Sequence, residues 1–213
     1  MRSLLGICLL FTSLLSAEIH VIYTSALIPR NFPARKGEYL RSFNALKNYG
    51  FDPWIIEATH IDHSFYNDIS NRVLYPHQNK YMHNLGANEL LSIRTCFPHF
   101  SFADEDVVVK LTGRYWLFQP TLFKIIRENP DYDVYIKKWF GNGWFEFTGC
   151  FAMKWKHFKK MFEAANPDSM NNDRIAIEEI LAKYIIENNL HALVLEKLDV
   201  LARINGIDET HAY

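Results

Sequence analysis

The sequence is poor in cysteine, glycine and proline, and these shortages exclude several classes of protein. Its 213 residues include three cysteines, nine glycines and eight prolines, whereas 49% of the residues are hydrophobic and 15% are aromatic. This composition excludes a disulfide framework and a disordered chain, and it is ample for one sizeable core. Net charge is also lacking, since the formal charge is −1 and no basic tract is present. We therefore expect no nucleic-acid partner.

Four common motifs are absent as well. The sequence has no glycine-rich Walker loop, no Gly-x-Gly-x-x-Gly after the first strand-like run, no Gly-x-Ser-x-Gly and no paired Cys-x-x-Cys. Their absence argues against a P-loop enzyme, a dehydrogenase, a serine hydrolase and a zinc ribbon. The sequence also contains no internal repeat and no low-complexity segment.

The only long apolar run is Leu4–Leu15, which follows Met1-Arg2-Ser3 and precedes Ser16-Ala17. This layout is typical of a secretory signal, and about 12 residues are fewer than the roughly 20 that span a bilayer. We expect a signal peptide, or a short anchor, at 1–17 and a single domain over 18–213. The protein would then be lumenal, periplasmic or extracellular, and cytoplasmic only if the leader does not function. Membrane contact would occur only through this segment, if it stays uncleaved.

Removal of the signal would leave two cysteines. Cys8 would be lost, and Cys96 and Cys150 would remain. Free buried thiols are the expectation, although an oxidising compartment would allow one bridge.

Strand-like and helix-like segments alternate along the chain, which predicts an α/β fold. We expect a mixed, mostly parallel central sheet flanked by helices in three layers. The stretch 59–78 is expected to be irregular, and the tail from about residue 205 to be loose. Strands are expected at 19–24, 54–58, 107–111, 133–137, 145–154 and within 193–204, and helices at 34–49, 90–97, 119–128, 155–165 and from about Arg174, the last capped by Asn171, Asn172 and Asp173.

The run Val107–Leu111 suits a strand buried on both faces, in the middle of the sheet. It ends at Thr112-Gly113-Arg114, where glycine permits close approach of a ligand and arginine offers a fork of donors. Ligands of open α/β sheets lie beyond the carboxyl ends of strands, so this edge is a candidate anion site. Thr24 and Ser25, at the end of the first strand, would join it. The alternative is a turn with a surface arginine.

Two further stretches carry candidate binding residues. The aromatic, glycine-rich segment 139–144 includes Trp139 and Trp144, which would form either the wall of a sugar site or a lid on the core. His60-x-Asp62-His63 has metal-ligand chemistry, but no second ligand group with recognised spacing accompanies it. We interpret it as solvated loop, and a hydrolase built on it is a weaker alternative.

The order of these elements resembles the A-type (GT-A-like) nucleotide-sugar glycosyltransferase fold over roughly residues 19–204. The resemblance lies in a helix with Asn84, Gly86 and Arg94, the strand Val-Val-Val-Lys-Leu-Thr-Gly-Arg-Tyr, the segment 147–152 and a later acid-bearing helix. It implies a nucleotide-diphosphate sugar as donor and a glycan or lipid-linked acceptor. The residues it places on the donor are Thr24, Ser25, Asn84, Arg94, Lys110, Thr112, Gly113 and Arg114, and those on the acceptor side are Trp139, Trp144, Thr148 and Gly149.

The sequence departs from that family at the metal site. Members usually hold a divalent metal with Asp-x-Asp at the carboxyl end of the central strand, but Asp104-x-Asp106 precedes this strand. We expect Arg114 to stabilise the pyrophosphate instead, with Lys110 or Arg94 assisting, in a metal-independent transferase without a cofactor. Loss of the motif is also compatible with loss of activity. The alternative is therefore a non-catalytic exported protein that binds carbohydrate or a host partner on a degenerate transferase fold.

An inverting transferase needs a base near the acceptor hydroxyl. The resemblance places such a carboxylate at the start of a helix, where Asp173, Glu178 and Glu179 are the candidates. A carboxylate there is also favoured by the helix dipole, which is a purely structural reason for its presence. On the earlier helix, Glu89 and Arg94 are expected on or near the exposed side.

Overall fold

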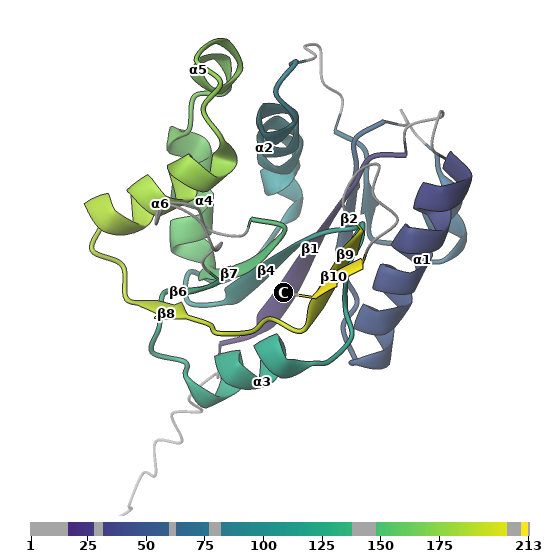
Figure 1. The fold of residues 1–213 in the computed structure, drawn as a ribbon, viewed down its shortest axis with the longest axis horizontal. Helices are drawn as coiled ribbons and strands as arrows, with labels where there is room; N and C mark the ends of the chain where they lie inside the picture. Colours follow the sequence, from purple (N-terminus) through teal and green to yellow (C-terminus); the bar gives the residue numbers. More distant parts are fainter. Residues whose placement is uncertain are drawn as a thin grey trace, which may run out of the picture.

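The structure, a computed structural model, describes residues 17–27, 32–59, 63–76, 82–137, 148–203 and 210–212. Neighbouring strands of its main sheet are parallel, except that β7 runs antiparallel to both neighbours. The predicted α/β fold with a mixed, mostly parallel sheet is confirmed (Figure 1). The spatial order of the sheet is β3 (Val73–Leu74), β2 (Trp54–Glu57), β1 (Ile19–Ser25), β4 (Val107–Thr112), β7 (Cys150–Lys154), β6 (Val134–Ile136) and β8 (Ala192–Val194).

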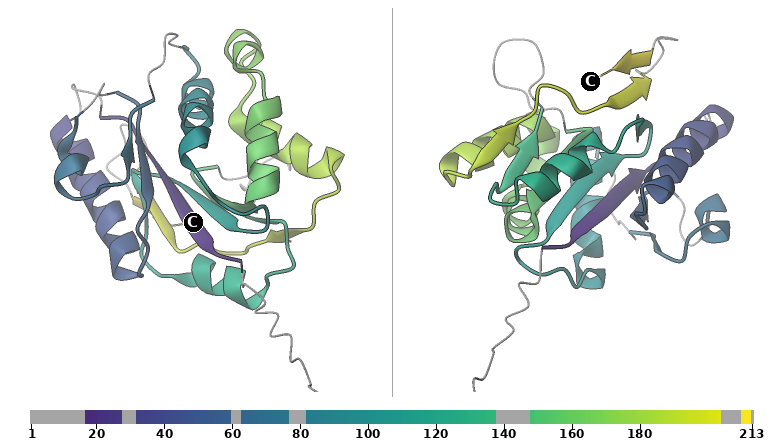
Figure 2. Two further views of the ribbon diagram at one scale, coloured as in Figure 1. Left: turned by 180° about the vertical axis from the view of Figure 1, so that it is seen from behind. Right: turned by 90° about the horizontal axis from the view of Figure 1, so that it is seen from below.

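Successive side chains along a strand point to opposite faces of the sheet. Both faces of this sheet carry hydrophobic side chains, and helices cover both. Val21 and Tyr23 belong to one hydrophobic cluster, with residues of α1 (Phe32–Asn48) and α3 (Thr121–Glu128). Ile22 and Val108 belong to the other cluster, with residues of α2, α4 and α6 (Figure 2). The bounds of these three helices are Leu85–Cys96, Trp155–Ala164 and Ile177–Glu187.

Strand β4 lies in the middle of the sheet, as its valine-rich sequence predicts. All its residues except Thr112 are buried. It pairs in parallel with β1, from Ile19 opposite Val107 to Thr24 opposite Thr112. The two strands therefore end at the same edge, and the polar residues that follow them lie together.

The segment before α6 differs from the prediction. Pro167–Asn172 form a separate short helix, α5, whose C-cap is Asp173, and α6 begins only at Ile177. Arg174 has a φ of +57°, the left-handed conformation that commonly ends a helix. The predicted cap at 171–173 is therefore wrong, since those residues end one helix rather than begin the next.

Two segments expected to be irregular contain regular structure. Within 59–78, Phe65–Asp68 form a 3₁₀ turn and β3 adds an edge strand beside β2. Near the carboxyl end, β10 (Thr210–Ala212) pairs with β9 (Val200–Arg203), which pairs with β5 (Tyr115–Leu117) in a second, antiparallel sheet. The prediction of a loose tail is wrong for 210–212, because backbone pairing holds them.

The described part of the chain has no helix with the length and apolar character needed to cross a membrane. Residues 1–16 lie outside the described residues, so the signal peptide stays a prediction. Cys96 and Cys150 are both buried and free, as expected. Burial raises the pKa of each thiol to about 12.

Candidate functional site

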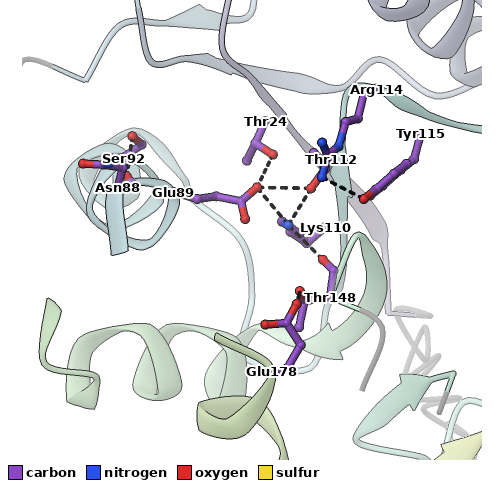
Figure 3. A network of polar contacts seen from close by, with 10 residues as sticks. All are labelled: Thr24, Asn88, Glu89, Ser92, Lys110, Thr112, Arg114, Tyr115, Thr148 and Glu178. Atoms are coloured by element: carbon purple, nitrogen blue, oxygen red, sulfur yellow. Dashed lines mark hydrogen bonds and ion pairs between the residues drawn. The ribbon is translucent and has the colours of Figure 1, made fainter. Parts of the chain in front are cut away.

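A buried polar network lies where β1 and β4 end (Figure 3). Thr24 pairs with Thr112 across the two strands, and Lys110 lies two residues before Thr112. These positions therefore share the face of the sheet that α2 covers. Glu89 of α2 and Thr148, just before β7, complete the network.

Lys110 is at the centre of this network, and its side chain is 1% exposed. Its Nζ lies 2.9 Å from Glu89 Oε1, 2.8 Å from Thr112 Oγ1 and 2.8 Å from the Thr148 carbonyl oxygen. An ammonium has three donors, so these contacts use all of them. Lys110 thus joins β4, α2 and β7 and does not extend toward a ligand, in contrast to its predicted role on the pyrophosphate.

Glu89 is the site residue that the sequence analysis missed. It was expected on or near the exposed side of its helix, yet its Oε1 accepts hydrogen bonds from Thr24 Oγ1 (2.5 Å) and Thr112 Oγ1 (3.2 Å) besides the Lys110 contact. Burial alone would raise the pKa of Glu89, but the Lys110 charge and these hydrogen bonds outweigh it, so the pKa is lowered. The available signal was a lysine inside a buried strand, which requires a carboxylate nearby.

This lowered pKa makes the stability of the protein depend on pH. Ionised Glu89 stabilises the fold fully above its pKa in the unfolded chain, about 4.3, and the contribution is lost as the pH falls through the lower folded-state pKa. We expect the difference in unfolding free energy between the wild type and Glu89→Gln to stay constant from about pH 7 to pH 5 and to shrink below about pH 4. Urea denaturation at each pH measures it. A difference that grows on acidification would contradict the assignment.

Arg114 lies at the same edge, in the two-residue turn between β4 and β5. Its Nη2 donates to the Tyr115 hydroxyl (2.9 Å), and its guanidinium lies over the Tyr115 ring, 4.9 Å from the centroid. Burial raises the pKa of the Tyr39 hydroxyl, and the positive charges of Arg35 and Arg114 oppose that rise. The Gly113 amide donates to the Thr24 carbonyl oxygen (2.8 Å), so the turn that carries Arg114 lies beside the end of β1.

Gly113 is explained by packing rather than by a ligand. A Cβ at this position would lie 2.7 Å from atoms of Tyr23 and 2.7 Å from the Tyr39 ring. The Tyr23 hydroxyl lies within hydrogen-bonding distance of the Gly113 and Tyr39 carbonyl oxygens, at 3.0 and 2.9 Å. The predicted close approach is thus made by two tyrosines of the core.

We expect Gly113→Ala to lower the free energy of unfolding by about 1–3 kcal/mol, because the added methyl overpacks a buried tyrosine pair. Chemical denaturation measures the loss. Gly37→Ala on α1 is the matched control, since its Cβ would meet no atom within 4 Å. A cost for Gly113→Ala no larger than that of the control would contradict this explanation.

Hydrogen bonds with Glu57 and Tyr66 hold the end of β1 and the loop that follows it. Ser25 Oγ donates to Glu57 Oε2 (2.6 Å) and accepts from the Tyr66 hydroxyl (3.0 Å). Glu57, which is fully buried, also accepts from the backbone of Leu27 (3.1 Å). Ser25 therefore positions this loop and does not present its hydroxyl to a ligand.

On the opposite side of Lys110, α6 contributes Glu178. Its Oε1 accepts from Thr148 Oγ1 (2.6 Å), and the Thr148 carbonyl in turn accepts from Lys110. The neighbouring Glu179 instead accepts from the Ala176 backbone (3.2 Å) and caps the helix. Of the three predicted base candidates, Glu178 alone has a hydrogen bond to the network, whereas the exposed Glu179 caps its own helix and the exposed Asp173 is the C-cap of α5.

Two other predicted donor residues have structural contacts. Asn84 caps α2 through Ala87, and its amide nitrogen donates to the carbonyls of Met170 (2.9 Å) and Ile175 (3.1 Å). Arg94 donates to the carbonyl of Ala165, at the end of α4 (3.3 Å). Both side chains therefore join α2 to its neighbouring helices rather than point to the end of β4.

The remaining predicted residues bond within the sheet, lie outside the described residues or are exposed. Gly149 serves the sheet, since its carbonyl accepts from the Thr112 amide (2.8 Å). Trp139, Trp144, His60 and Asp62 lie outside the described residues, and His63 is exposed. The acceptor wall and the interpretation of residues 60–63 as solvated loop therefore stay predictions.

The turn that ends β4 carries no carboxylate ligand for a divalent cation. Thr112, Gly113 and Arg114 offer no carboxylate, and Glu89 Oε1 is already occupied by an ammonium and two hydroxyls. Asp106 lies at the other end of β4, where it accepts from the Glu18 amide (2.9 Å). Across the described residues, no group of three or more His, Cys, Asp or Glu side chains is placed to hold a metal.

Comparison with known proteins identifies the fold. No protein-family model and no curated protein matches the sequence. The structure is similar to that of a glycosyltransferase involved in the glycosylation of the major capsid of PBCV-1, with a TM-score of 0.54 and 12% identity, covering 83% of this chain and 81% of that chain. A candidate nucleotide-diphospho-sugar transferase from Desulfovibrio desulfuricans G20 matches with a TM-score of 0.49 and 11% identity, covering 84% and 80%. The first likeness confirms the GT-A-like fold.

Proposed function

We propose that the chain is a glycosyltransferase that transfers a sugar from a nucleotide-diphosphate donor to a glycan or lipid-linked acceptor without a divalent metal. The observation that carries the proposal is the charge placement in a GT-A-like fold. The end of β4, where the fold family holds its metal, bears Arg114, and Glu178 lies on the other side of the same network. Sugar transfer develops negative charge on the leaving diphosphate, which a cation stabilises, and releases a proton from the acceptor hydroxyl, which a carboxylate accepts.

Arg114 is proposed to stabilise the leaving group. As the bond between the anomeric carbon and the diphosphate oxygen breaks, negative charge accumulates on the diphosphate, and a guanidinium can pair with two of its oxygens. Tyr115 holds the arginine in place, because its hydroxyl accepts a hydrogen bond from Arg114 and its ring lies against the guanidinium. A preorganised cation of this kind lowers the barrier without reorganising during the reaction.

Glu178 is proposed as the base of an inverting reaction. It accepts the proton of the acceptor hydroxyl while that oxygen forms its bond to the anomeric carbon. Thr148 donates to one carboxylate oxygen and fixes the carboxylate orientation, and the other oxygen has no hydrogen-bond partner among the described residues. A base needs such a positioned and accessible oxygen.

The proposed reaction also limits the compartment. Nucleotide sugars occur in the cytoplasm and in the eukaryotic secretory lumen, so export to a bacterial periplasm would separate the enzyme from its donor. We therefore propose the secretory lumen if residues 1–17 act as a signal, and the cytoplasm if they do not. N-terminal sequencing of the protein from its native membranes and supernatant distinguishes the two.

The test is an assay of donor hydrolysis and transfer with a panel of uridine, guanosine, cytidine and thymidine sugar nucleotides, with and without EDTA. We expect turnover of at least one donor at a rate that EDTA does not change. Turnover abolished by EDTA would refute the metal-free mechanism. Glycan binding without turnover of any donor, unchanged by Arg114→Ala and Glu178→Gln, would favour the non-catalytic carbohydrate-binding alternative.

A further inference from the structure

The two carboxylate oxygens of Glu89 have different surroundings. Oε1 receives Lys110, Thr24 and Thr112, whereas Oε2 has no hydrogen-bond partner among the described residues. The side chain keeps 20% of its surface exposed. In Figure 3 the second oxygen points away from Thr24, toward the side on which Glu178 lies.

The three donors to Glu89 Oε1 do more than balance the charge of Lys110. A single contact with Lys110 would suffice for charge balance, yet two threonine hydroxyls from different strands also fix the carboxylate in one orientation. An ionised carboxylate only accepts hydrogen bonds, so its second oxygen is a preset acceptor. It fits a hydroxyl and repels another carboxylate.

Glu89 Oε2 lies near the place where the proposed site would hold the sugar nucleotide. Thr112, which donates to Glu89, is separated from Arg114 by one residue at the end of β4. In a nucleotide-diphosphate sugar, the sugar is attached directly to the diphosphate. A diphosphate held by Arg114 therefore brings the sugar hydroxyls close to the network that contains Glu89.

We propose that Glu89 is a specificity-determining residue whose Oε2 accepts a hydrogen bond from a hydroxyl of the transferred sugar and so selects neutral sugars over uronic acids. The inference rests on the proposed glycosyltransferase function and adds the class of sugar. Lys110 then has a positioning role, because it keeps the carboxylate ionised and oriented from the buried side.

The test is calorimetric binding of three ligands to the wild type and to Glu89→Gln. The ligands are a nucleoside diphosphate from the panel, its neutral hexose conjugate and its uronic acid conjugate. We expect Glu89→Gln to weaken the neutral conjugate about 10- to 100-fold, the loss of one hydrogen bond to a charged group. Binding of the nucleoside diphosphate should change less than about twofold, and discrimination against the uronate should diminish.

The controls separate three failures. Equal weakening of all three ligands, or no change in any, would overturn the inference while the proposed function stands. Absence of binding of any ligand to the wild type would overturn the proposed function and this inference with it. Glu187→Gln, an exposed substitution on α6, should change none of the affinities. If Glu89→Gln does not fold, Glu89→Gln with Lys110→Met removes both charges, and the comparison is made on that variant.

Discussion

Replacing Lys110 by methionine is expected to lower the free energy of unfolding by about 3 kcal/mol. Methionine keeps the length of the apolar stem but removes the ammonium. Glu89 would then retain a charge with only the two threonine hydroxyls as partners, and the Thr148 carbonyl would lose its donor. We place the cost at the lower end of the range for broken buried pairs because the Glu89 side chain is 20% exposed. Urea denaturation with intrinsic fluorescence measures the change.

The paired variant distinguishes the charge from the packing. In Lys110→Met with Glu89→Gln, neither charge remains, and the glutamine oxygen can still accept from Thr24 and Thr112. Buried ion pairs replaced as a pair are often tolerated, so most of the lost stability should return. A double variant as unstable as the sum of the single ones would show that the two residues do not act as a pair.

Glu178→Gln is expected to reduce the rate of transfer about 10²- to 10⁴-fold, the usual contribution of a general base. Glutamine keeps the shape of the side chain and can accept the Thr148 hydrogen bond, but it cannot take a proton from the acceptor. Donor binding should therefore remain unchanged. Steady-state kinetics with donor and acceptor varied separately would show the loss in kcat.

The neighbouring Glu179→Gln is the matched control. Glu179 caps α6 through the Ala176 amide, and glutamine performs the same capping role. We expect transfer and stability to stay close to those of the wild type. A larger loss of activity from Glu179→Gln than from Glu178→Gln would reverse the assignment of the two residues.

The order of the elements was largely predictable, because it depends on local patterns. The valine run around Val108 required a strand buried on both faces, and β4 is the central strand. Gly50 ends α1 with a φ of +84°, as a glycine after the last apolar position suggests. The predicted cap before α6 is wrong because Asn and Asp side chains suit the end of α5 as well as the start of a helix.

The site was predictable in position but not in detail. Strand ends placed Thr24 and Thr112 at one edge, whereas the roles of Lys110 and Glu89 depend on how α2 packs over the sheet. That packing is a tertiary feature without a local sequence signal. Likewise, the sequence favours a ligand contact at Gly113, because the two tyrosines that require the glycine, Tyr23 and Tyr39, come from β1 and α1.

The electrostatic claim about Arg114 is tested most directly by calorimetric binding of uridine, guanosine and thymidine diphosphates in EDTA. We expect one of them to bind the wild type and to bind Arg114→Ala about 10- to 100-fold more weakly, since a charge-assisted contact is lost. Arg127→Ala is the control, because Arg127 also lies over an aromatic ring, that of Phe51, but is carried by α3. Equal affinity for the wild type and Arg114→Ala, or binding that appears only when magnesium or manganese is added, would contradict the account.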